Sequence, residues 1–171
     1  GLYPDEAINA NQGLFEPGKI FYPENNGREG LFNNLLAISL RIFGISVLSI
    51  RLVSALIGIL TVWGLSLLTK ELFEVMPDGL QASSSKFQAN VLTALFAAFF
   101  LAVSFWHVNF SRIIFRAILL PLTSVFGFYF LVKGLKRHGL VDFISAGLLF
   151  GLGFYTYISY RLLVLILAPI I

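Results

Sequence analysis

The feature that most constrains this chain is its set of long apolar segments with few or no charged residues. The clearest runs from Leu52 to Leu68 and contains no charged side chain. With its flanks, from Val47 to Phe73, it is long enough to cross the hydrocarbon core of a bilayer, which takes about 20 residues of helix. Further apolar segments follow it along the chain. The protein is therefore predicted to be all-α, a polytopic bundle of transmembrane helices.

Composition excludes several classes of protein. Hydrophobic residues make up 57% of the chain and charged residues 12%, whereas about a quarter of the residues of a soluble domain are charged. The chain has 18 Phe and no Cys, which favours helices packed by aromatic and aliphatic side chains, without disulfides or thiolate metal ligands. The net charge of +3 is spread over short polar segments. Such charge is typical of contact with lipid headgroups, and we expect no nucleic-acid partner.

Residues 1–46 are predicted to form an outer loop that contains short interfacial helices. Pro4 to Leu14 begins with Pro, Asp and Glu and is expected to be a helix. Phe15 to Arg28 is rich in Pro, Gly and Asn and is expected to be a loop. Glu29 to Phe43 is periodic but short for a span, so we expect it to lie in the interface. Its predicted apolar stripe comprises Leu31, Leu35, Ile38 and Ile42.

Residues 47–171 are predicted to be the transmembrane part. The expected spans are Val47 to Phe73, Phe87 to Trp106, Ser111 to Val132 and Val141 to Tyr157, with a fifth beginning at Arg161. Polar connections are expected at Glu74 to Lys86 and at Lys133 to His138. The chain opens in a polar loop without an initiating Met and stops inside an apolar run. We therefore expect a fragment, truncated at its C-terminus and inactive alone.

Membrane orientation follows from the densest basic segment. Lys133, Lys136 and Arg137 precede any nearby acid, which predicts a cytoplasmic position for this segment. By alternation, the Asp5 loop, the Arg112 to Arg116 segment and the Tyr157 to Arg161 turn share the outer side. The outer arginines run against the positive-inside tendency. They either reach to lipid headgroups or hold an anionic ligand.

Residue spacing suggests what such a ligand is. Arg112 and Arg116 are four positions apart, which places them on one face of a helix, where two guanidinium groups can grip a phosphate or pyrophosphate. Tyr157 and Arg161 have the same spacing and the same predicted side. Asp5 and Glu6 either cap a helix or supply a carboxylate base. A base opposite an arginine clamp suits glycosyl transfer from a lipid-linked phosphosugar.

Four short stretches, in this order, carry a resemblance to a known family. They are Tyr3-Pro4-Asp5-Glu6, Gly27 to Phe32, Ile50 to Gly58, and Ser111 to Arg116 ahead of Leu120-Pro121. The chain resembles the GT-C superfamily of membrane glycosyltransferases, in the branch of protein mannosyltransferases and aminoarabinose transferases, over nearly its whole length. The resemblance implies a polyprenyl-phosphate sugar donor. It also implies an acidic pair in the first extracytoplasmic loop, after a first transmembrane helix that we expect to precede this sequence.

The resemblance also suggests roles for single residues. Asp5 matches an acidic residue that acts as base or binds metal, Glu6 matches its neighbour, and Arg112 matches an arginine of a later outer loop. Arg116 is added from its spacing alone. Several relatives have a Lys-Pro-Pro run where this chain has Arg28-Glu29-Gly30, so Arg28 is either a phosphate contact or a solvated loop charge.

Two further side chains have two interpretations each. Arg51 fits the family pattern, but an arginine at the start of a span is commonly an interfacial anchor. His107 beside Trp106 is either an interfacial side chain or a metal ligand or second base.

The sequence therefore predicts sugar transfer from a polyprenyl-phosphate donor at the extracytoplasmic face of the plasma (inner) membrane. Asp5 and Glu6 are the predicted catalytic pair, and Arg112, Arg116 and Arg28 the predicted phosphate ligands. Tyr157 and Arg161 are expected to contact substrate. A divalent metal is compatible with the acidic pair, while the sugar and the acceptor are not determined. The alternatives are a transporter or flippase of an anionic or lipid-linked substrate, and a structural membrane subunit.

Overall fold

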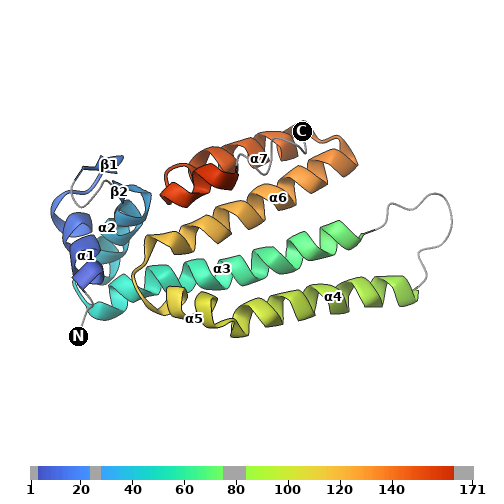
Figure 1. Ribbon diagram of the computed structural model, residues 1–171, viewed down its shortest axis with the longest axis horizontal. Helices are drawn as coiled ribbons and strands as arrows, with labels where there is room; N and C mark the ends of the chain where they lie inside the picture. Colours follow the sequence, from blue (N-terminus) through green and yellow to red (C-terminus); the bar gives the residue numbers. More distant parts are fainter. Residues whose placement is uncertain (1–3, 24–27, 75–83, 164–171) are drawn as a thin grey trace.

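The computed structural model describes residues 4–23, 28–74 and 84–163. Four helices run side by side along the long axis of the molecule (Figure 1): α3 (Val47–Phe73), α4 (Ser84–Val103), α6 (Leu119–Arg137) and α7 (Leu140–Gly153). Two more, α1 (Pro4–Phe15) and α2 (Leu31–Phe43), form a cap at one end. The fold is thus an all-α bundle with short helices in its N-terminal segment, and the predicted fold class is confirmed.

The cap contains a small hairpin that the sequence did not predict. Strand β1 (Phe21–Tyr22) pairs antiparallel with β2 (Arg28–Glu29), within and just beyond the segment expected to be a loop. Two-residue strands are too short to show an alternating pattern. Tyr22 is fully buried and its hydroxyl donates to the backbone carbonyl of Glu16 at 2.6 Å, so the hairpin is tied to the end of α1.

Helix α2 has 13 residues, too few to span a membrane, and its buried face differs from the predicted one. Phe32, Leu36 and Leu40 are buried, whereas Ile38 and Ile42 of the predicted stripe are largely exposed. The buried set packs against α3, so tertiary contact selects the Phe32 face. The exposed isoleucines then form an outward apolar surface, as expected of a helix at a lipid interface.

Helix α3 has the predicted bounds. Its N-terminus is capped by Ser46, whose hydroxyl accepts a hydrogen bond from the backbone N–H of Ser49 at 3.1 Å. This satisfies one of the amide donors that a helix start leaves without a partner. The helix is 27 residues long and apolar enough to cross a membrane, and the helical segment Arg116–Arg137 also meets these criteria.

The second and third predicted spans have wrong boundaries. The chain breaks at Ser104 and bends by 60° between Gln88–Val103 and α5 (Phe105–Arg112), so the helical path continues beyond Trp106. Ile113 and Phe115 then have extended backbone angles, and the 3-10 helix η1 (Arg116–Ile118) leads into α6. Ser111 and Arg112 therefore end α5, Ile113 to Phe115 form a turn, and the candidate span begins at Arg116.

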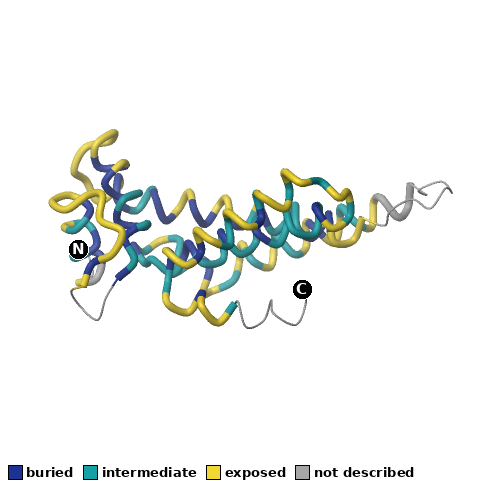
Figure 2. Tube along the Cα trace, turned by 90° about the horizontal axis from the view of Figure 1, so that it is seen from above, coloured by how far each residue is buried: buried dark blue, intermediate teal, exposed yellow. Residues whose placement is uncertain are grey.

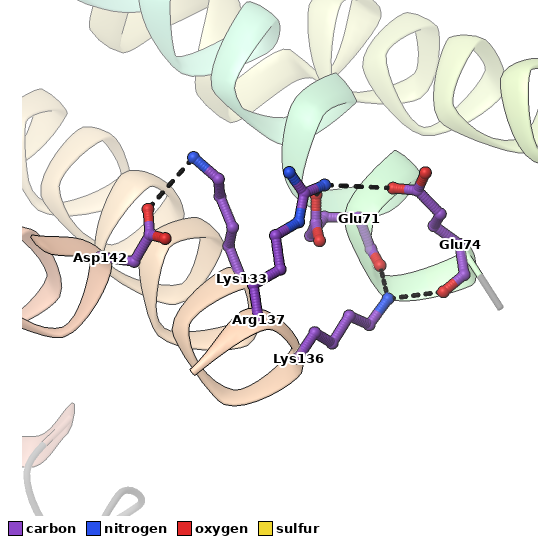
Figure 3. Close-up of polar contacts among 6 residues, drawn as sticks. All are labelled: Glu71, Glu74, Lys133, Lys136, Arg137 and Asp142. Carbon is purple, nitrogen blue, oxygen red and sulfur yellow. Dashed lines mark hydrogen bonds and ion pairs between the residues drawn. The ribbon is translucent and has the colours of Figure 1, made fainter. Parts of the chain in front are cut away.

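The predicted loop at Lys133 to His138 is mostly helix. Helix α6 continues to Arg137 and ends at His138, which has a positive φ of 52°. The basic side chains find acceptors on the end of α3 (Figure 3): Lys136 donates to the backbone carbonyls of Glu71 and Glu74, and Arg137 pairs with Glu71 at 3.5 Å. Cations also suit the negative end of a helix dipole. Charged contacts therefore extend α6 by a turn.

Helix α7 is shorter than the predicted fourth span. It has 14 residues and ends at Gly153, followed by the short 3-10 helix η2 (Ile158–Tyr160). It is apolar, but it does not reach the length of a span by itself. Most of the predicted fifth segment lies outside the described residues.

The densest core lies where the cap meets the bundle. Nine buried side chains pack together there: Phe32, Leu36, Leu40, Ile50, Val53, Ile57, Ile114, Ile118 and Leu119. They come from α2, α3, the turn after α5, η1 and the first residue of α6. Along the long helices, exposed positions recur between buried ones (Figure 2). On α4 the exposed set includes Leu95, Phe99 and Phe100, which suits a lipid-facing surface.

Candidate functional site

The predicted site residues gather at the capped end of the bundle. The starts of α1, α3 and α6 and the ends of α5 and α7 all lie there, while the ends of α3 and α6 lie at the far end (Figure 1). This arrangement agrees with the alternation expected from sequence. It brings the Asp5 segment, the Arg112 to Arg116 turn and Tyr157 to one end, and the Lys133 to Arg137 turn to the other.

Two side chains of α1 hold a single residue of the turn between α5 and α6. Glu6 Oε1 accepts a hydrogen bond from the backbone N–H of Ile114 at 3.1 Å, and Asn9 Nδ2 donates to the carbonyl of Ile114 at 3.1 Å. All three residues are buried. Because both backbone polar groups of Ile114 would otherwise be unsatisfied, this bracket fastens α1 to the turn.

Glu6 has a second partner on α3. Its Oε2 accepts from Arg51 Nη2 at 3.2 Å, and the Glu6 side chain is only 2% exposed whereas that of Arg51 is 39% exposed. One carboxylate thus joins α1, α3 and the α5–α6 turn. Both oxygens of Glu6 are hydrogen bonded, an arrangement that orients the turn. Arg51 is a contact of this centre as well as a residue near the start of a span.

Asp5 is the second residue of α1, in its first turn. The position of its side chain lies outside what the structure describes. The backbone places it between Pro4 and Glu6, in the turn at the positive end of the helix dipole.

Two of the three predicted phosphate ligands are engaged with other side chains. Arg28 is 8% exposed and donates from Nη1 to Asn9 Oδ1 at 3.1 Å, so it is not a solvated loop charge. Arg116 pairs with Glu29 at 3.3 Å, and its guanidinium lies 5.9 Å from the ring centroid of Tyr157. These contacts tie the hairpin to η1 and to the turn after α7.

Arg112 differs from them, because it ends α5 with an exposed side chain. Within the described ranges, it makes no ion pair or side-chain hydrogen bond. It lines a cavity of about 590 Å³ together with Arg51, Asn109 and Ser111. We call this space the arginine cavity. Arg116 is not among its lining residues, so the helical pairing predicted for Arg112 and Arg116 is wrong. The extended residues between them separate the two guanidinium groups.

Tyr157 and Arg161 were also predicted to share a face through their spacing of four, but the backbone between them is not one continuous α-helix. Tyr157 has extended angles, φ −158° and ψ 145°, and η2 separates it from Arg161, which is exposed. The structure instead brings Tyr157 to Arg116. Spacing along the chain could not have shown this contact, because Arg116 lies just before α6 and Tyr157 lies just after α7.

A second cavity of about 590 Å³ adjoins the first. It is lined by Pro4, Glu6, Phe105, Trp106, Asn109, Phe110 and the Ile113 to Phe115 segment. We call it the aromatic cavity. Asn109 and Ile113 line both cavities. Asn109 was not singled out from sequence, since a lone Asn in an amphipathic segment carries no distinctive signal.

Comparison with known proteins now decides the family. A family model described as dolichyl-phosphate-mannose-protein mannosyltransferase matches residues 31–171, most of the chain. The chain belongs to this family. The resemblance inferred from the four stretches is thereby confirmed, although α1, with Asp5 and Glu6, and Arg28 lie before the matched segment. No curated protein and no solved structure matches the chain.

Membership of this mannosyltransferase family gives the site its general chemistry. The family transfers a glycosyl group from a polyprenyl-phosphate-linked donor in a membrane. The chain is accordingly a glycosyltransferase of the mannosyltransferase type and an integral membrane protein. An exposed arginine beside a cavity at the end of a membrane bundle is suited to a phosphate group.

His107 has a structural role in this fold. It is 8% exposed, and its Nε2 lies 3.1 Å from the carbonyl oxygen of Gly58 on α3. Because a carbonyl only accepts, Nε2 carries the proton and donates. Gly58 permits the contact: a Cβ there would lie 2.6 Å from Cβ of Ser111. The ring is buried against α3, so the expectation of an interfacial side chain at His107 is wrong.

Among the residues that the structure describes, no group of three or more His, Cys, Asp or Glu side chains is placed to hold a metal ion. Glu6 supplies one carboxylate at the capped end, and its neighbours there are Arg51 and a backbone amide.

Proposed function

We propose that this protein transfers a sugar from a polyprenyl-phosphate donor to an acceptor hydroxyl at the extracytoplasmic membrane face, with Asp5 as general base. One observation carries the proposal. The acidic first turn of α1 is fastened through Glu6 to the Ile114 backbone, two residues after Arg112. The segment that carries Asp5 and the segment that carries Arg112 are thus joined by a direct hydrogen bond at the same end of the bundle.

Arg112 is proposed to bind the donor phosphate. In the transfer step the bond between the anomeric carbon and the phosphate oxygen breaks, and negative charge grows on the phosphate that leaves. A guanidinium that is already in place stabilises this charge without reorganisation. Arg28 and Arg116 are proposed to add positive potential, while Asn9 and Glu29 hold them in position. Tyr157 orients Arg116, and exposed Arg161 adds charge near the turn after α7.

The aromatic cavity is the proposed place of the acceptor. Pro4 and Glu6, the residues on either side of Asp5, both line it. The Asp5 carboxylate takes the proton of the acceptor hydroxyl while that oxygen forms the new bond to the anomeric carbon. A divalent metal held by the acidic pair would supply charge stabilisation at the phosphate, but both oxygens of Glu6 already accept hydrogen bonds, from Arg51 and from the Ile114 amide.

The outer location of the site is supported by charge at the opposite end. The arginines at the capped end run against the positive-inside tendency, as expected if they hold an anionic donor, and the proposed orientation rests on the dense basic segment of Lys133, Lys136 and Arg137 on the last turns of α6. Their pairing with Glu71, Glu74 and Asp142 therefore leaves the prediction intact. This end is assigned to the cytoplasm, which puts the site on the extracytoplasmic side.

The test is sugar transfer by the full-length protein in membranes, comparing Asp5→Asn with the parent. Asp142→Asn serves as the matched control, because Asp142 pairs with Lys133 at the far end. We expect Asp5→Asn to abolish transfer with normal membrane insertion and Asp142→Asn to retain it. Retained activity in Asp5→Asn removes Asp5 from the mechanism. Absence of transfer by the parent, together with movement of substrate across vesicles, overturns the enzyme assignment in favour of a transporter.

A further inference from the structure

Helix α5 is joined to its neighbours through non-helical backbone at both ends. Ser104, before it, has φ −63° and ψ 127°, and the helical path bends by 60° at this residue. Ile113, after it, has φ −104° and ψ 159°. A helix of eight residues between two such joints takes its position from the helices that it packs against. Helix α5 lies beside α3 near the capped end (Figure 1).

One buried side chain joins α5 directly to α3. His107 donates from Nε2 to the carbonyl oxygen of Gly58 at 3.1 Å, in a buried place. A carbonyl oxygen has two lone pairs, so Gly58 accepts this bond in addition to its bond within α3. The imidazole of His107 is a buried titratable group that takes no part in the proposed transfer step.

Close approach of the two helices occurs at the same place. A Cβ on Gly58 would lie 2.6 Å from Cβ of Ser111 and 3.7 Å from Nε2 of His107. Ser111 lies four positions after His107 on α5, so the two side chains are on one face of that helix. The hydrogen bond and the close packing at Gly58 therefore hold α5 in one position along α3.

The position of α5 sets the width of the arginine cavity. Helix α3 supplies one wall with Arg51, and α5 supplies another with Asn109 and Arg112. Arg51 and Gly58 are seven positions apart, about two turns, so they lie on nearly the same side of α3. His107 is not among the residues that line this cavity. It therefore acts on a ligand there only through the side chains that α5 carries.

We infer that His107 is a positioning residue for sugar transfer, because its hydrogen bond to Gly58 sets the distance between Arg112 of α5 and Arg51 of α3. The inference rests on the proposed function, in which Arg112 binds the donor phosphate. Without this hydrogen bond, the joints at both ends of α5 let the helix shift, and Arg112 is present but misplaced. A misplacement of about 1 Å lowers a rate by up to about a hundredfold, so the effect is measurable.

The test combines substitutions of His107 with Arg112→Gln in the full-length protein and measures sugar transfer in membranes. His107→Leu keeps an apolar side chain but removes the donor, whereas His107→Gln keeps an amide N–H that can donate. We expect His107→Leu to lower kcat/KM by about tenfold and His107→Gln to stay within about threefold of the parent. In the Arg112→Gln background, His107→Leu should lower kcat/KM by less than about twofold, because the side chain through which it acts is absent.

Thr61→Val is the matched control. Thr61 is buried on α3, three positions after Gly58, and its hydroxyl donates to the carbonyl of Ile57 in the same helix at 2.8 Å. The substitution removes a buried hydrogen bond of α3 and leaves the link to α5 in place. Transfer per folded molecule, with the folded amount measured by thermal unfolding in detergent, should stay within about twofold of the parent.

Three results overturn the inference while transfer by the parent stands: full activity of His107→Leu, an equal loss in the parent and Arg112→Gln backgrounds, or an equal loss in His107→Gln and Thr61→Val. If His107→Leu does not insert, Gly58→Ala takes its place, because the added methyl group meets Ser111 and displaces α5. A loss that depends on Arg112 then supports the inference, and a loss independent of Arg112 overturns it. Absence of transfer by the parent overturns the proposed function itself.

Discussion

The carboxylate of Glu6 accepts a hydrogen bond from the backbone amide of Ile114, 108 positions later in the chain. This contact joins the first described helix to the turn that carries Arg112 and Arg116 at its two ends. The same carboxylate binds Arg51 of α3. A single side chain therefore sets the position of the acidic helix relative to three arginines, and its removal gives the most direct test of the capped end.

Replacing Glu6 with Ala is expected to lower the free energy of unfolding by about 2 kcal/mol. The Ile114 amide loses its acceptor in a buried place, and Arg51 loses a charged partner that is already partly screened by solvent. Denaturation of the purified protein in detergent measures the change. Glu16→Ala is the control, since Glu16 pairs with Lys19 at an exposed position and that pair contributes little. A Glu6 variant as stable as the control would contradict the role given to the bracket.

Asn9→Ala is expected to cost about 1–3 kcal/mol by itself, because the Ile114 carbonyl and Arg28 each lose a partner. Glu6 and Asn9 hold the same residue, so their effects should not add. A double-mutant cycle measured by denaturation should give a coupling energy of about 0.5 kcal/mol or more. Strict additivity would mean that the two side chains act independently.

Arg112→Gln is expected to raise the KM for the donor by about tenfold or more, which corresponds to the loss of a charge-assisted hydrogen bond. Arg112→Lys should restore only part of the affinity, because an ammonium group cannot bind phosphate through two parallel donors. Stability should stay within about 0.5 kcal/mol of the parent, since the side chain is exposed. Arg41→Gln, at an exposed position near the end of α2, is the control. An unchanged KM for Arg112→Gln would remove this residue from the phosphate site.

Two glycines of α7 should respond in opposite directions to substitution by Ala. A Cβ at Gly153 would overlap the ring of Tyr160, whereas a Cβ at Gly147 would meet no atom within 4 Å. Gly153→Ala is expected to destabilise the protein by about 1–3 kcal/mol through overpacking. Gly147→Ala should stabilise it by about 0.5–1 kcal/mol, because Ala is the better helix former. Thermal unfolding of the two variants checks the prediction, and similar melting temperatures would show that Tyr160 moves aside.

Local patterns predicted much of the architecture but fewer of the contacts. The bounds of α3 followed from one uninterrupted apolar segment, Leu52 to Leu68, and its flanks. The apolar pattern does not show the break at Ser104, because the residues on both sides remain hydrophobic. The buried face of α2 could not be chosen either, since its apolar residues lie on more than one side and only contact with α3 selects Phe32, Leu36 and Leu40.

The candidate site was predicted by composition and spacing only in part. Asp5, Glu6 and Arg112 belong to short stretches whose order indicated the family, and the family match over residues 31–171 includes Arg112 but neither Asp5 nor Glu6. The helical pairing of Arg112 with Arg116 was wrong, because spacing of four implies a common face only where the intervening backbone is helical. Asn109 lines both cavities, and Tyr157 packs against the guanidinium of Arg116. Both arrangements depend on residues that are distant in sequence.

By itself the sequence determined the membrane class, the helical fold and the family. These depend on the length of apolar segments and on the order of short motifs, which are properties of consecutive residues. Only the tertiary structure decided that Glu6 holds Ile114, that Arg28 and Arg116 are engaged, and that Arg112 lines a cavity together with Arg51. These depend on which distant backbone groups and charges must satisfy one another once the helices pack, and no local pattern contains that information.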